Sequence, residues 1–387
     1  MSLDLSYADS VYITPEHITL RDQVARFLVE EVEPVAHAWE EQGCVPREVL
    51  RKMGALGLLG ITYPEEYGGA QADALTSLVF AEALSRSTFG GFVVTVLVHT
   101  DMASPHLVHA GTREQLQRFL PRIISGELIT AVGITEPDAG SDVAGLRTRA
   151  RRERGQWVLN GAKMFITNGV HADLYFIAAR TDPDAKGSRG ISMFIVEKGT
   201  PGFRVGRALK KTGWLCSDTA ELVFDDCRVP EANLLGEENA GFYAVMKNFQ
   251  TERIALSAMA VGHCMTALAF TLDYVRTRKA FGASLYEKQV IRQRLAMLQA
   301  KTEAARQFMY HCAWLVTQGR ECVKDVSMLK ALTGELANEV MYACQQFHGG
   351  MGYMRESAVE RLTRDARVLA IGGGATEVML EEVAKRS

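Results

Sequence analysis

The chain has 387 residues, a length that allows two or three compact domains, each with its own hydrophobic core. Hydrophobic residues make up 47% of the sequence and charged residues 23%, which is typical of a globular protein and excludes a disordered one. The net charge of -3 gives no general electrostatic reason to bind nucleic acid or an anionic membrane, so small molecules or proteins are the expected partners.

The sequence favours a protein of a reducing environment that binds no metal. Seven cysteines are scattered without a Cys-x-x-Cys pair, which favours free thiols over a disulfide framework or a zinc site. Residues 1–10, MSLDLSYADS, lack the basic start and apolar run of a secretory signal. His99, His106 and His109 are explained more simply as core or solvated histidines than as metal ligands. We therefore expect a cytoplasmic protein without a bound metal.

The first third of the sequence has the periodicity of helices. Apolar residues recur at helical spacing between His17 and Val32, and residues 74–84 and 113–119 show the same pattern. Turn residues such as Gly68 and Gly69 separate these segments. The pattern predicts an α-helical N-terminal domain over residues 1–127.

The pattern changes to short strands in the middle of the chain. Trp157-Val158-Leu159 and Met164-Phe165-Ile166 flank Asn160-Gly161, a dipeptide suited to a tight hairpin turn. Further strands are expected at residues 174–179, 191–196 and 220–224. We predict a central β-barrel or β-sandwich domain over residues 128–238.

Long helical patterns return at residues 241–277, 286–318 and 324–347, and a last helix is expected from about Ala375. Residues 254–272 contain no Asp, Glu, Lys or Arg, but Ser257, His263 and several alanines favour a helix buried in a bundle over a membrane span. We predict an antiparallel helical bundle over residues 239–387, and an α+β fold for the whole chain.

Glu252 is the residue most indicative of chemistry, because a helix would place it on an apolar face. A carboxylate there must be paired or have its pKa raised by desolvation, and a raised pKa suits a base that removes a proton from carbon. Pairing with a distant arginine is the competing interpretation, because Arg253 lies about 100° around the helix. The apolar residues of this face are Val245, Phe249, Leu256 and Met259.

Two polar stretches are candidates for holding a cofactor. VGITEPDAGSD (132–142) offers backbone and hydroxyl donors at Gly140 and Ser141, which suit a flavin edge or a phosphate. RKAFG (278–282) offers Arg278 to a phosphate, and Gly282 is the expected stop of the first long helix. A domain connector and a solvated arginine are the alternative interpretations.

Six short sequence strings follow one another along nearly the whole chain. They are PEEYGG (64–69), ITEPDAGSD (134–142), NGAKMFITNG (160–169), RKAFG (278–282), QFHGGMGY (346–353) and RDARVLAIGGGATEV (364–378). Together they resemble the acyl-CoA dehydrogenase family. The resemblance implies FAD held between subunits of a homotetramer, an acyl-CoA substrate and an electron-transferring flavoprotein as electron acceptor.

The resemblance also implies roles for individual residues. Arg253 matches an arginine near the CoA chain, and Ser141 matches a serine near both the FAD pyrophosphate and the CoA part of the substrate. Positions that match FAD contacts within one subunit are Thr135, Ser141, Phe165, Thr167, Thr376 and Glu377, and those that match contacts from a neighbouring subunit are Arg278, Phe281, Gln289, Gln346, Gly349 and Gly350.

The position of the catalytic base separates two groups within the family. Many relatives carry a catalytic glutamate in the final loop, where this chain has Gly373. A subset resembling isovaleryl-CoA and long-chain dehydrogenases carries it on the long helix before an arginine, and Glu252-Arg253 matches that position. We predict Glu252 as the base, and a pocket widened near Gly373 for branched or medium-to-long acyl chains.

The predicted reaction is α,β-dehydrogenation of an acyl-CoA thioester, in which Glu252 removes the α-proton and a hydride passes to flavin N5. Two alternatives use the same fold. One is an acyl-CoA oxidase or flavin monooxygenase, in which reduced flavin meets oxygen. The other is a non-catalytic protein that binds FAD or acyl-CoA.

Overall fold

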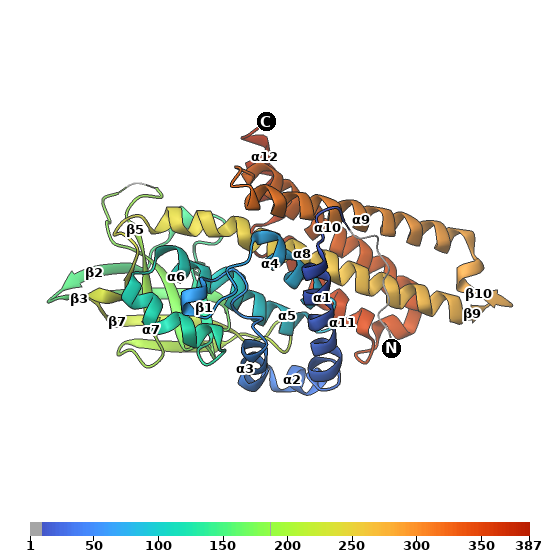
Figure 1. Cartoon of the computed structure of the whole chain (residues 1–387), viewed down its shortest axis with the longest axis horizontal. Helices are drawn as coiled ribbons and strands as arrows, with labels where there is room; N and C mark the ends of the chain where they lie inside the picture. The colour runs from blue at the N-terminus through green and yellow to red at the C-terminus, as the bar shows by residue number, and fades with distance from the viewer. Residues whose placement is uncertain (1–9, 186) are drawn as a thin grey trace.

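A computed structural model describes residues 10–185 and 187–387, with the backbone alone for Ala244 and Lys247. The MSLDLSYADS start thus lies outside the described residues except for Ser10. Helical elements occupy the first part of the chain, strands the middle and long helices the last part (Figure 1). This order confirms the predicted α, β, α arrangement.

The N-terminal part is helical. Thr112 caps α7 by accepting a hydrogen bond from the backbone N–H of Gln115 at 3.2 Å, and the Gln115 side chain accepts one from the Thr112 N–H at 3.0 Å. The α-helices are α1 (Pro15–Phe27), α2 (Ala36–Gln42), α3 (Arg47–Ala55), α4 (Ala74–Leu84), α5 (Gly90–Leu97), α6 (Ser104–Ala110) and α7 (Arg113–Ile124), with π-helical turns at Leu28–Val32 and Val98–Ala103 and a 3-10 turn at Glu65–Tyr67.

The middle part is one eight-stranded sheet in the order β6-β7-β3-β2-β4-β5-β8, with β1 paired to β4 in parallel. β4 and β5 are buried along nearly their whole length, which is typical of apolar strands in a sheet that is covered on both faces. The strands are β1 (Thr130–Gly133), β2 (Arg149–Glu153), β3 (Gln156–Thr167), β4 (Leu174–Arg180), β5 (Ile191–Glu197), β6 (Phe203–Ala208), β7 (Thr219–Pro230) and β8 (Leu234–Leu235).

The predicted hairpin turn at Asn160-Gly161 is wrong. β3 runs through this dipeptide without interruption, and its pairing with β7 shifts register between Leu159 and Gly161. The hairpin turn lies instead at Arg154-Gly155, between β2 and β3, where φ is 51° and 76°. Gly161 accommodates a close approach, since a Cβ there would lie 2.5 Å from Thr148 Oγ1.

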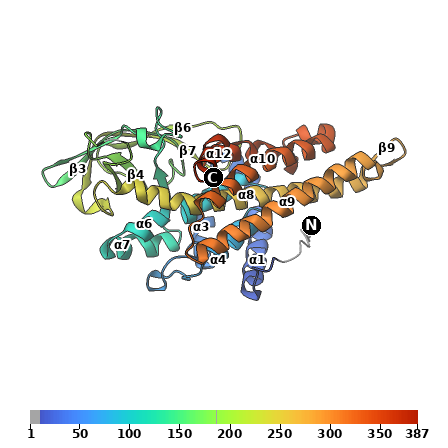
Figure 2. The same cartoon turned by 90° about the horizontal axis from the view of Figure 1, so that it is seen from above.

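The C-terminal part is a bundle around α8, which runs from the sheet to the far end of the molecule beside α4 and α10 (Figures 1 and 2). Its elements are α8 (Gly241–Thr277), β9 (Lys279–Ala280), β10 (Ala283–Ser284), α9 (Gln289–Thr317), α10 (Val323–His348), α11 (Ala358–Ala366) and α12 (Thr376–Ala384), with 3-10 turns at Leu285–Glu287, Gly349–Tyr353 and Arg367–Ala370. Two shorter 3-10 turns, Val143–Gly145 and Glu231–Asn233, belong to the middle part.

The prediction that Gly282 stops the first long helix is wrong. α8 ends at Thr277, and Phe281 and Gly282 form the turn between β9 and β10 with φ of 53° and 80°. The physical reason is that Lys279 and Ala280 pair with Ser284 and Ala283, so an extended hairpin replaces the last helical turn.

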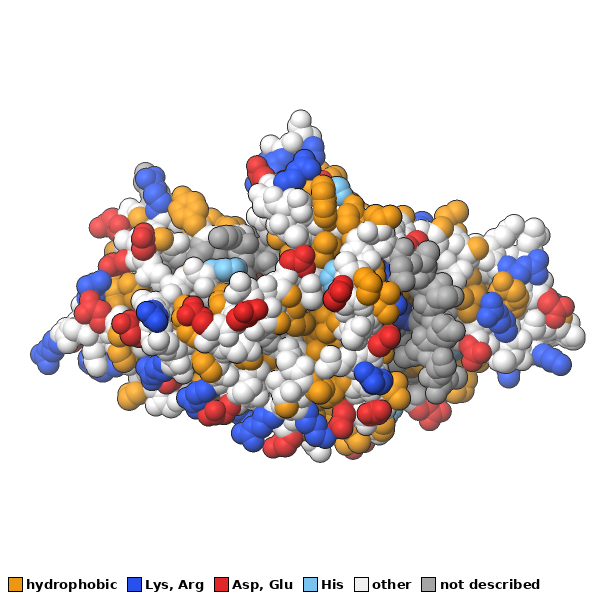
Figure 3. Space-filling model, viewed as in Figure 1, with side chains coloured by type: hydrophobic (Ala, Val, Ile, Leu, Met, Phe, Trp, Pro, Cys, Tyr) orange, Lys and Arg blue, Asp and Glu red, His pale blue; other side chains and the backbone are white. Residues whose placement is uncertain are grey.

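α8 has the length and apolarity of a membrane span, but 89% of its most apolar 18-residue window is buried inside the protein. This burial agrees with the expected core helix of a bundle. On the face shown in Figure 3, basic and acidic side chains are interspersed, without a broad field of one sign. The described residues on this face thus form no large basic patch of the kind that binds nucleic acid.

Candidate active site

Glu252 lies on the apolar face of α8 that the sequence predicts. Its neighbours Val245, Leu256 and Met259 are 1%, 5% and 0% exposed, while the Glu252 side chain itself stays partly accessible. Among residues 10–185 and 187–387, no side chain forms a hydrogen bond with its carboxylate. Burial raises the pKa of Glu252 to about 7, although the positive charges of Arg253 and Lys330 oppose that rise. A carboxylate with this pKa can accept a proton near neutral pH.

Gly373 faces Glu252 from the glycine loop, which we define as residues 371–375. A Cβ at Gly373 would lie 2.1 Å from Leu256 Cδ1 and 3.5 Å from Glu252 Oε1, and its φ of +63° further favours glycine. A larger side chain at position 373 would compete with α8 for the same space. The absence of a side chain at Gly373 thus allows the loop to approach Leu256 and Glu252 on α8 closely.

Arg253 follows Glu252 along α8 but does not pair with it through a hydrogen bond. Its guanidinium carbon lies 5.5 Å from the centre of the Phe249 ring, and its buried Nε lacks a partner within the described part of the chain. Burial lowers the pKa of Arg253, and the negative charges of Glu252 and Glu382 oppose this change. The competing interpretation of Glu252, a locked ion pair with a distant arginine, is not seen among these contacts.

The polar loop after β1 lies against β3, because the backbone N–H of Met164 donates to the Thr135 carbonyl at 2.9 Å. This contact brings Thr135 close to Phe165, whose side chain is 67% exposed on a backbone with φ of 62°. Thr167 follows two residues later and is half-buried. Ser141 lies at the exposed outer part of the same loop.

A buried ion pair beneath this loop was not predicted from the sequence. Lys163 Nζ donates to Glu136 Oε1 at 2.7 Å and to the Ile134 carbonyl at 3.1 Å, and Glu136 also accepts from the backbone N–H groups of Arg147 and Thr148. The only sequence signal was a lysine at an inward position of a strand. The pair fixes the backbone that carries Thr135.

Thr376 and Glu377 begin α12, and the predicted contacts from a neighbouring subunit lie at the opposite end of the bundle from the sheet, where Figure 1 shows β9 and β10. The Tyr274 and His348 rings stack with 4.2 Å between centroids, which joins the end of α8 to the end of α10. The structure does not bring this group to Glu252 within one chain. Its members Arg278, Phe281, Gln289, Gln346, Gly349 and Gly350 are all exposed.

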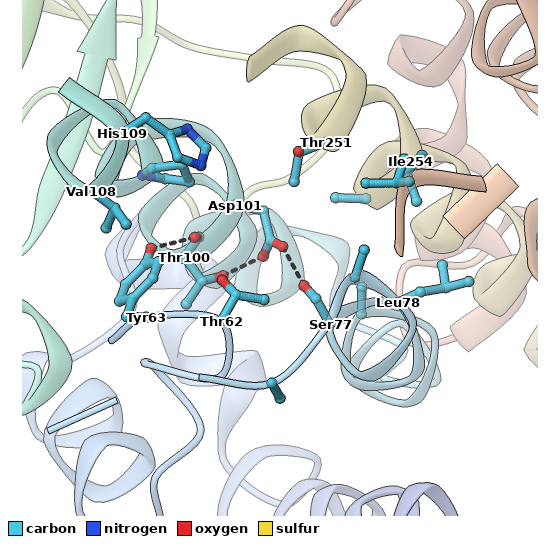
Figure 4. A pocket seen from close by; sticks show the side chains of 16 residues that line it. Thr62, Tyr63, Ser77, Leu78, Thr100, Asp101, Val108, His109, Thr251 and Ile254 are labelled. Carbon is cyan, nitrogen blue, oxygen red and sulfur yellow. Dashed lines mark hydrogen bonds between the residues drawn. The ribbon is translucent and has the colours of Figure 1, made fainter. Parts of the chain in front are cut away.

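A cavity of about 210 Å³ lies on another flank of α8, where Thr251 and Ile254 line it (Figure 4). Asp101 faces this cavity and accepts hydrogen bonds from Ser77 Oγ at 2.8 Å and Thr100 Oγ1 at 2.5 Å. Burial raises the pKa of Asp101, and the two hydroxyl bonds oppose that rise. Neither Glu252 nor Gly373 lines this cavity, so it is distinct from the candidate active site.

Models of three protein domains match the chain in succession. They are described as acyl-CoA dehydrogenase N-terminal domain, middle domain and C-terminal domain, and match residues 14–127, 131–227 and 239–387. The chain belongs to the acyl-CoA dehydrogenase family. Members of this family are FAD-dependent enzymes that dehydrogenate acyl-CoA thioesters, and the chain is an oxidoreductase of this class.

Individual members of the acyl-CoA dehydrogenase family match over the full length. The chain is 41% identical to the long-chain specific acyl-CoA dehydrogenase of Rattus norvegicus, covering 96% of this chain and 86% of the relative. It is 37% identical to the isovaleryl-CoA dehydrogenase of Pongo abelii, covering 95% and 87%. The crystal structure of an acyl-CoA dehydrogenase from Geobacillus kaustophilus superposes with a TM-score of 0.94 at 40% identity, covering 98% of this chain and 99% of that one.

The residues around β1 and β3 fit the flavin that acyl-CoA dehydrogenases use. Phe165 offers an exposed aromatic ring, and Thr135 and Thr167 offer hydroxyl groups beside it. A Cβ at Gly140 would meet no atom within 4 Å, so the loop leaves room for a bulky group. An isoalloxazine ring with its phosphates needs this combination of a flat apolar surface, several donors and open space.

Proposed function

We propose that this enzyme acts on branched or medium-to-long acyl-CoA thioesters and uses Glu252 as the base that removes the α-proton. The observation that carries the assignment of the base is the fit of Gly373 against Leu256 and Glu252. A side chain at position 373 would have to displace Leu256 and would need a φ of +63°, which supports a base carried by the helix and not by the loop. The elevated pKa of Glu252, about 7, supports proton abstraction at neutral pH.

The residues of the chain divide the work between proton transfer and binding. Bound FAD supplies the hydride acceptor at its N5 atom. The Glu252 carboxylate takes the proton from the α-carbon while a hydride leaves the β-carbon, so the thioester loses one proton and one hydride in total. Arg253 binds the CoA part of the substrate, and its partially desolvated guanidinium suits a phosphate or an amide carbonyl.

FAD contacts are assigned to residues of two subunits. In one subunit, Thr135 and Thr167 hold the ring, Phe165 lies beside it, Ser141 serves the pyrophosphate and the substrate, and Thr376 and Glu377 close the site from the start of α12. The neighbouring subunit contributes the exposed group at the far end of the bundle, which is Arg278, Phe281, Gln289, Gln346, Gly349 and Gly350.

The same assignment requires at least a dimer, and we propose a homotetramer. Large apolar side chains are exposed on the C-terminal part, and a monomer would leave them in water. The exposed fractions reach 98% for Phe281, 78% for Tyr353, 74% for Val290 and 71% for Tyr342. An electron-transferring flavoprotein is the proposed electron acceptor. A matching chain with 36% identity belongs to a solved structure described as the electron transferring flavoprotein of Acidaminococcus fermentans, which supports an association between this fold and such a protein.

The preference for branched or longer chains rests on the glycine loop. Gly372, Gly373 and Gly374 carry no side chains, and the atoms nearest to a Cβ at Gly373 belong to Leu256 and Glu252 on α8. The relatives include long-chain, isovaleryl-CoA and short-chain specific acyl-CoA dehydrogenases, so the preference is proposed from the loop alone. An oxidase is the second candidate, since a prolyl acyl carrier protein oxidase matches with a TM-score of 0.92 and 28% identity.

The first test is anaerobic bleaching of the bound flavin by a panel of acyl-CoA thioesters. Branched and medium-to-long thioesters are expected to bleach it faster than short straight ones, and hydrogen peroxide release in air would instead identify the oxidase. Glu252→Gln is expected to keep yellow bound FAD but to slow bleaching by roughly 10²-fold or more, because the general base is removed.

The matched control is Glu381→Gln, which neutralises an exposed carboxylate on α12 that pairs with Lys385. This variant is expected to bleach at the wild-type rate. Near-normal bleaching by Glu252→Gln would remove Glu252 from the mechanism and leave the family assignment unchanged.

A further inference from the structure

Lys330 is a buried cation that the proposed mechanism does not use. It lies on α10, is 2% exposed, and donates from Nζ to the carbonyls of Leu369 at 2.7 Å and Gly374 at 3.0 Å. Leu369 precedes the glycine loop and Gly374 lies within it. One ammonium group therefore ties both ends of the segment that contains Gly373.

The same face of α10 carries further contacts to this segment. Gly334 allows a close approach, since a Cβ there would lie 2.7 Å from the Leu369 carbonyl oxygen. Asn338 Nδ2 donates to the Ala366 carbonyl at 3.4 Å, and Thr376 Oγ1 donates to Glu335 at 2.7 Å. The glycine loop is thus docked on α10, and Lys330 is the only charged donor among these contacts.

No carboxylate forms an ion pair with Lys330 among the described residues, so its charge is compensated by carbonyl dipoles and by more distant groups. Burial lowers the pKa of Lys330 to about 8, the negative charges of Glu252 and Glu335 raise it, and Arg253 lowers it. Glu252 is the carboxylate with the largest such effect. The two residues thus act on each other across the loop, although they come from different helices.

We propose that Lys330 is a positioning residue for the dehydrogenation, which holds the glycine loop against Glu252 and stabilises the carboxylate form of Glu252 with its positive charge. The proposal rests on Glu252 being the base, as proposed above. A buried ammonium is costly unless it is well solvated by the protein, so a merely structural tie between α10 and the loop would be served equally well by a neutral donor. The choice of a cation at this position is explained by the negative charge of Glu252, whose Oε1 lies 3.5 Å from the Cβ position of Gly373 in the same loop.

The test is the pH dependence of anaerobic flavin bleaching in the wild type, Lys330→Met and Lys330→Gln. Glu252 is faced by two cations, Arg253 on its own helix and Lys330 on α10, and Arg253 is unchanged in both variants. Removing the Lys330 charge raises the pKa of Glu252, so the acidic limb moves to higher pH. We expect bleaching about three to ten times slower than wild type near pH 6, which corresponds to a shift of about half a pKa unit to one unit.

The alkaline side of the profile provides an internal check. The pKa of Lys330 is about 8, so the wild type also loses this charge above that pH. The rates of the wild type and Lys330→Gln are therefore expected to converge toward pH 9. Lys330→Gln retains a neutral donor for the loop, whereas Lys330→Met retains none.

Hydrogen–deuterium exchange at the glycine loop gives a readout that does not depend on turnover. Faster exchange of residues 371–375 is expected in Lys330→Met than in Lys330→Gln, because only the amide can still bond a loop carbonyl. Lys324→Met is the matched control, since this lysine lies on the same helix and donates only to the Arg386 carbonyl in an exposed contact. It is expected to match the wild type in both measurements.

The outcomes separate this inference from the proposed function. A wild type that no acyl-CoA thioester bleaches would defeat the proposed function itself. A wild type that bleaches with an acidic limb near pH 7, together with an unchanged limb in both Lys330 variants, would overturn the role of Lys330 alone. A loss of equal size at every pH, with faster loop exchange, would also overturn it by reducing Lys330 to a structural tie.

Discussion

At the scale of single residues, the difference between Glu252 and Lys330 shows what a sequence can and cannot disclose. Glu252 is predictable, because its apolar neighbours are four and seven positions away on one helix. Lys330 is not, because its carbonyl partners are 39 and 44 positions away and have no side-chain signature. The function of a side chain bonded to a distant backbone follows only from the fold.

The fit between Gly373 and α8 leads to a prediction about Gly373→Ala. The added methyl group would overlap Leu256 Cδ1 and would impose an unfavourable φ of +63°. We expect a loss of roughly 1–3 kcal/mol in the free energy of unfolding, together with slower flavin bleaching as the loop moves away from Glu252. Differential scanning fluorimetry and the anaerobic bleaching assay measure the two effects.

The neighbouring glycine provides the control for this steric explanation. A Cβ at Gly372 would make only ordinary contacts with Val368 at 3.7 Å, so Gly372→Ala is expected to be close to neutral. Gly373→Ala combined with Leu256→Ala should recover part of the bleaching rate lost in the single variant, since the overlapping atom is removed. Equal effects of the two glycine substitutions would contradict the assignment of Gly373 to a close contact.

At the scale of elements, periodicity predicted the long helices of the bundle and the strands β4, β5 and β7, and the clearest error concerned β3. Asn160-Gly161 has the composition of a hairpin turn, but the strand continues because β7 pairs with it on both sides of a register shift. β7 is far away in the sequence, so local patterns cannot distinguish a bulge from a turn here. The actual turn, Arg154-Gly155, contains only one residue with a strong turn preference.

The same strand supports the candidate flavin loop through Lys163, which leads to a second prediction. Lys163 is 0% exposed and Glu136 is 5% exposed. Burial alone would raise the pKa of Glu136, but the Lys163 ammonium and the hydrogen bonds from Thr148 and Arg147 together outweigh burial and hold that pKa below its usual value. Lys163→Met leaves a buried carboxylate without its cation, so we expect a destabilisation of about 3–5 kcal/mol and weaker FAD retention. Thermal unfolding and flavin release on gel filtration measure these effects.

A surface ion pair provides the control for the buried Lys163–Glu136 pair. Arg118 and Glu197 form a bridge of 2.7 Å with side chains 55% and 39% exposed, so Arg118→Met is expected to cost less than about 1 kcal/mol. Adding Glu136→Gln to Lys163→Met should restore part of the stability, because no unpaired charge stays buried and the amide oxygen can still accept from one of the two N–H groups, that of Arg147 or that of Thr148. Similar losses for Lys163→Met and Arg118→Met would show that the buried pair does not support the loop.

At the scale of the whole molecule, the order of helical and strand-rich regions was predictable, but the contacts that join them were not. Asp365 on α11 accepts hydrogen bonds from the backbone N–H of Gly90, at the start of α5, at 3.0 Å and from that of Trp214, beyond β6, at 2.5 Å. Asp365 lies in the last part of the chain, Gly90 in the first and Trp214 in the middle. Nothing in the local pattern around Asp365 indicates that role, because its partners are backbone groups.

Asp365 carries the prediction for the assembly of the three parts. It is 0% exposed, and burial raises its pKa to about 7, although the hydrogen bonds from Trp214 and Gly90 oppose that rise. Asp365→Ala leaves two buried N–H groups without acceptors, so we expect a loss of about 2–4 kcal/mol in the free energy of unfolding.

The pH dependence of stability follows from the raised pKa of Asp365. A carboxyl group whose pKa is raised in the folded state stabilises the fold at low pH, and this contribution is lost as pH rises from about 4 to about 7. Asp365→Asn, which keeps one uncharged acceptor, should therefore cost less near pH 8 than near pH 5. Thermal unfolding of the holoenzyme at both pH values measures this, with the exposed Asp22→Asn on α1 as a control expected within about 0.5 kcal/mol of wild type. A wild-type unfolding temperature for Asp365→Ala would mean that the three parts are held together without this carboxyl group.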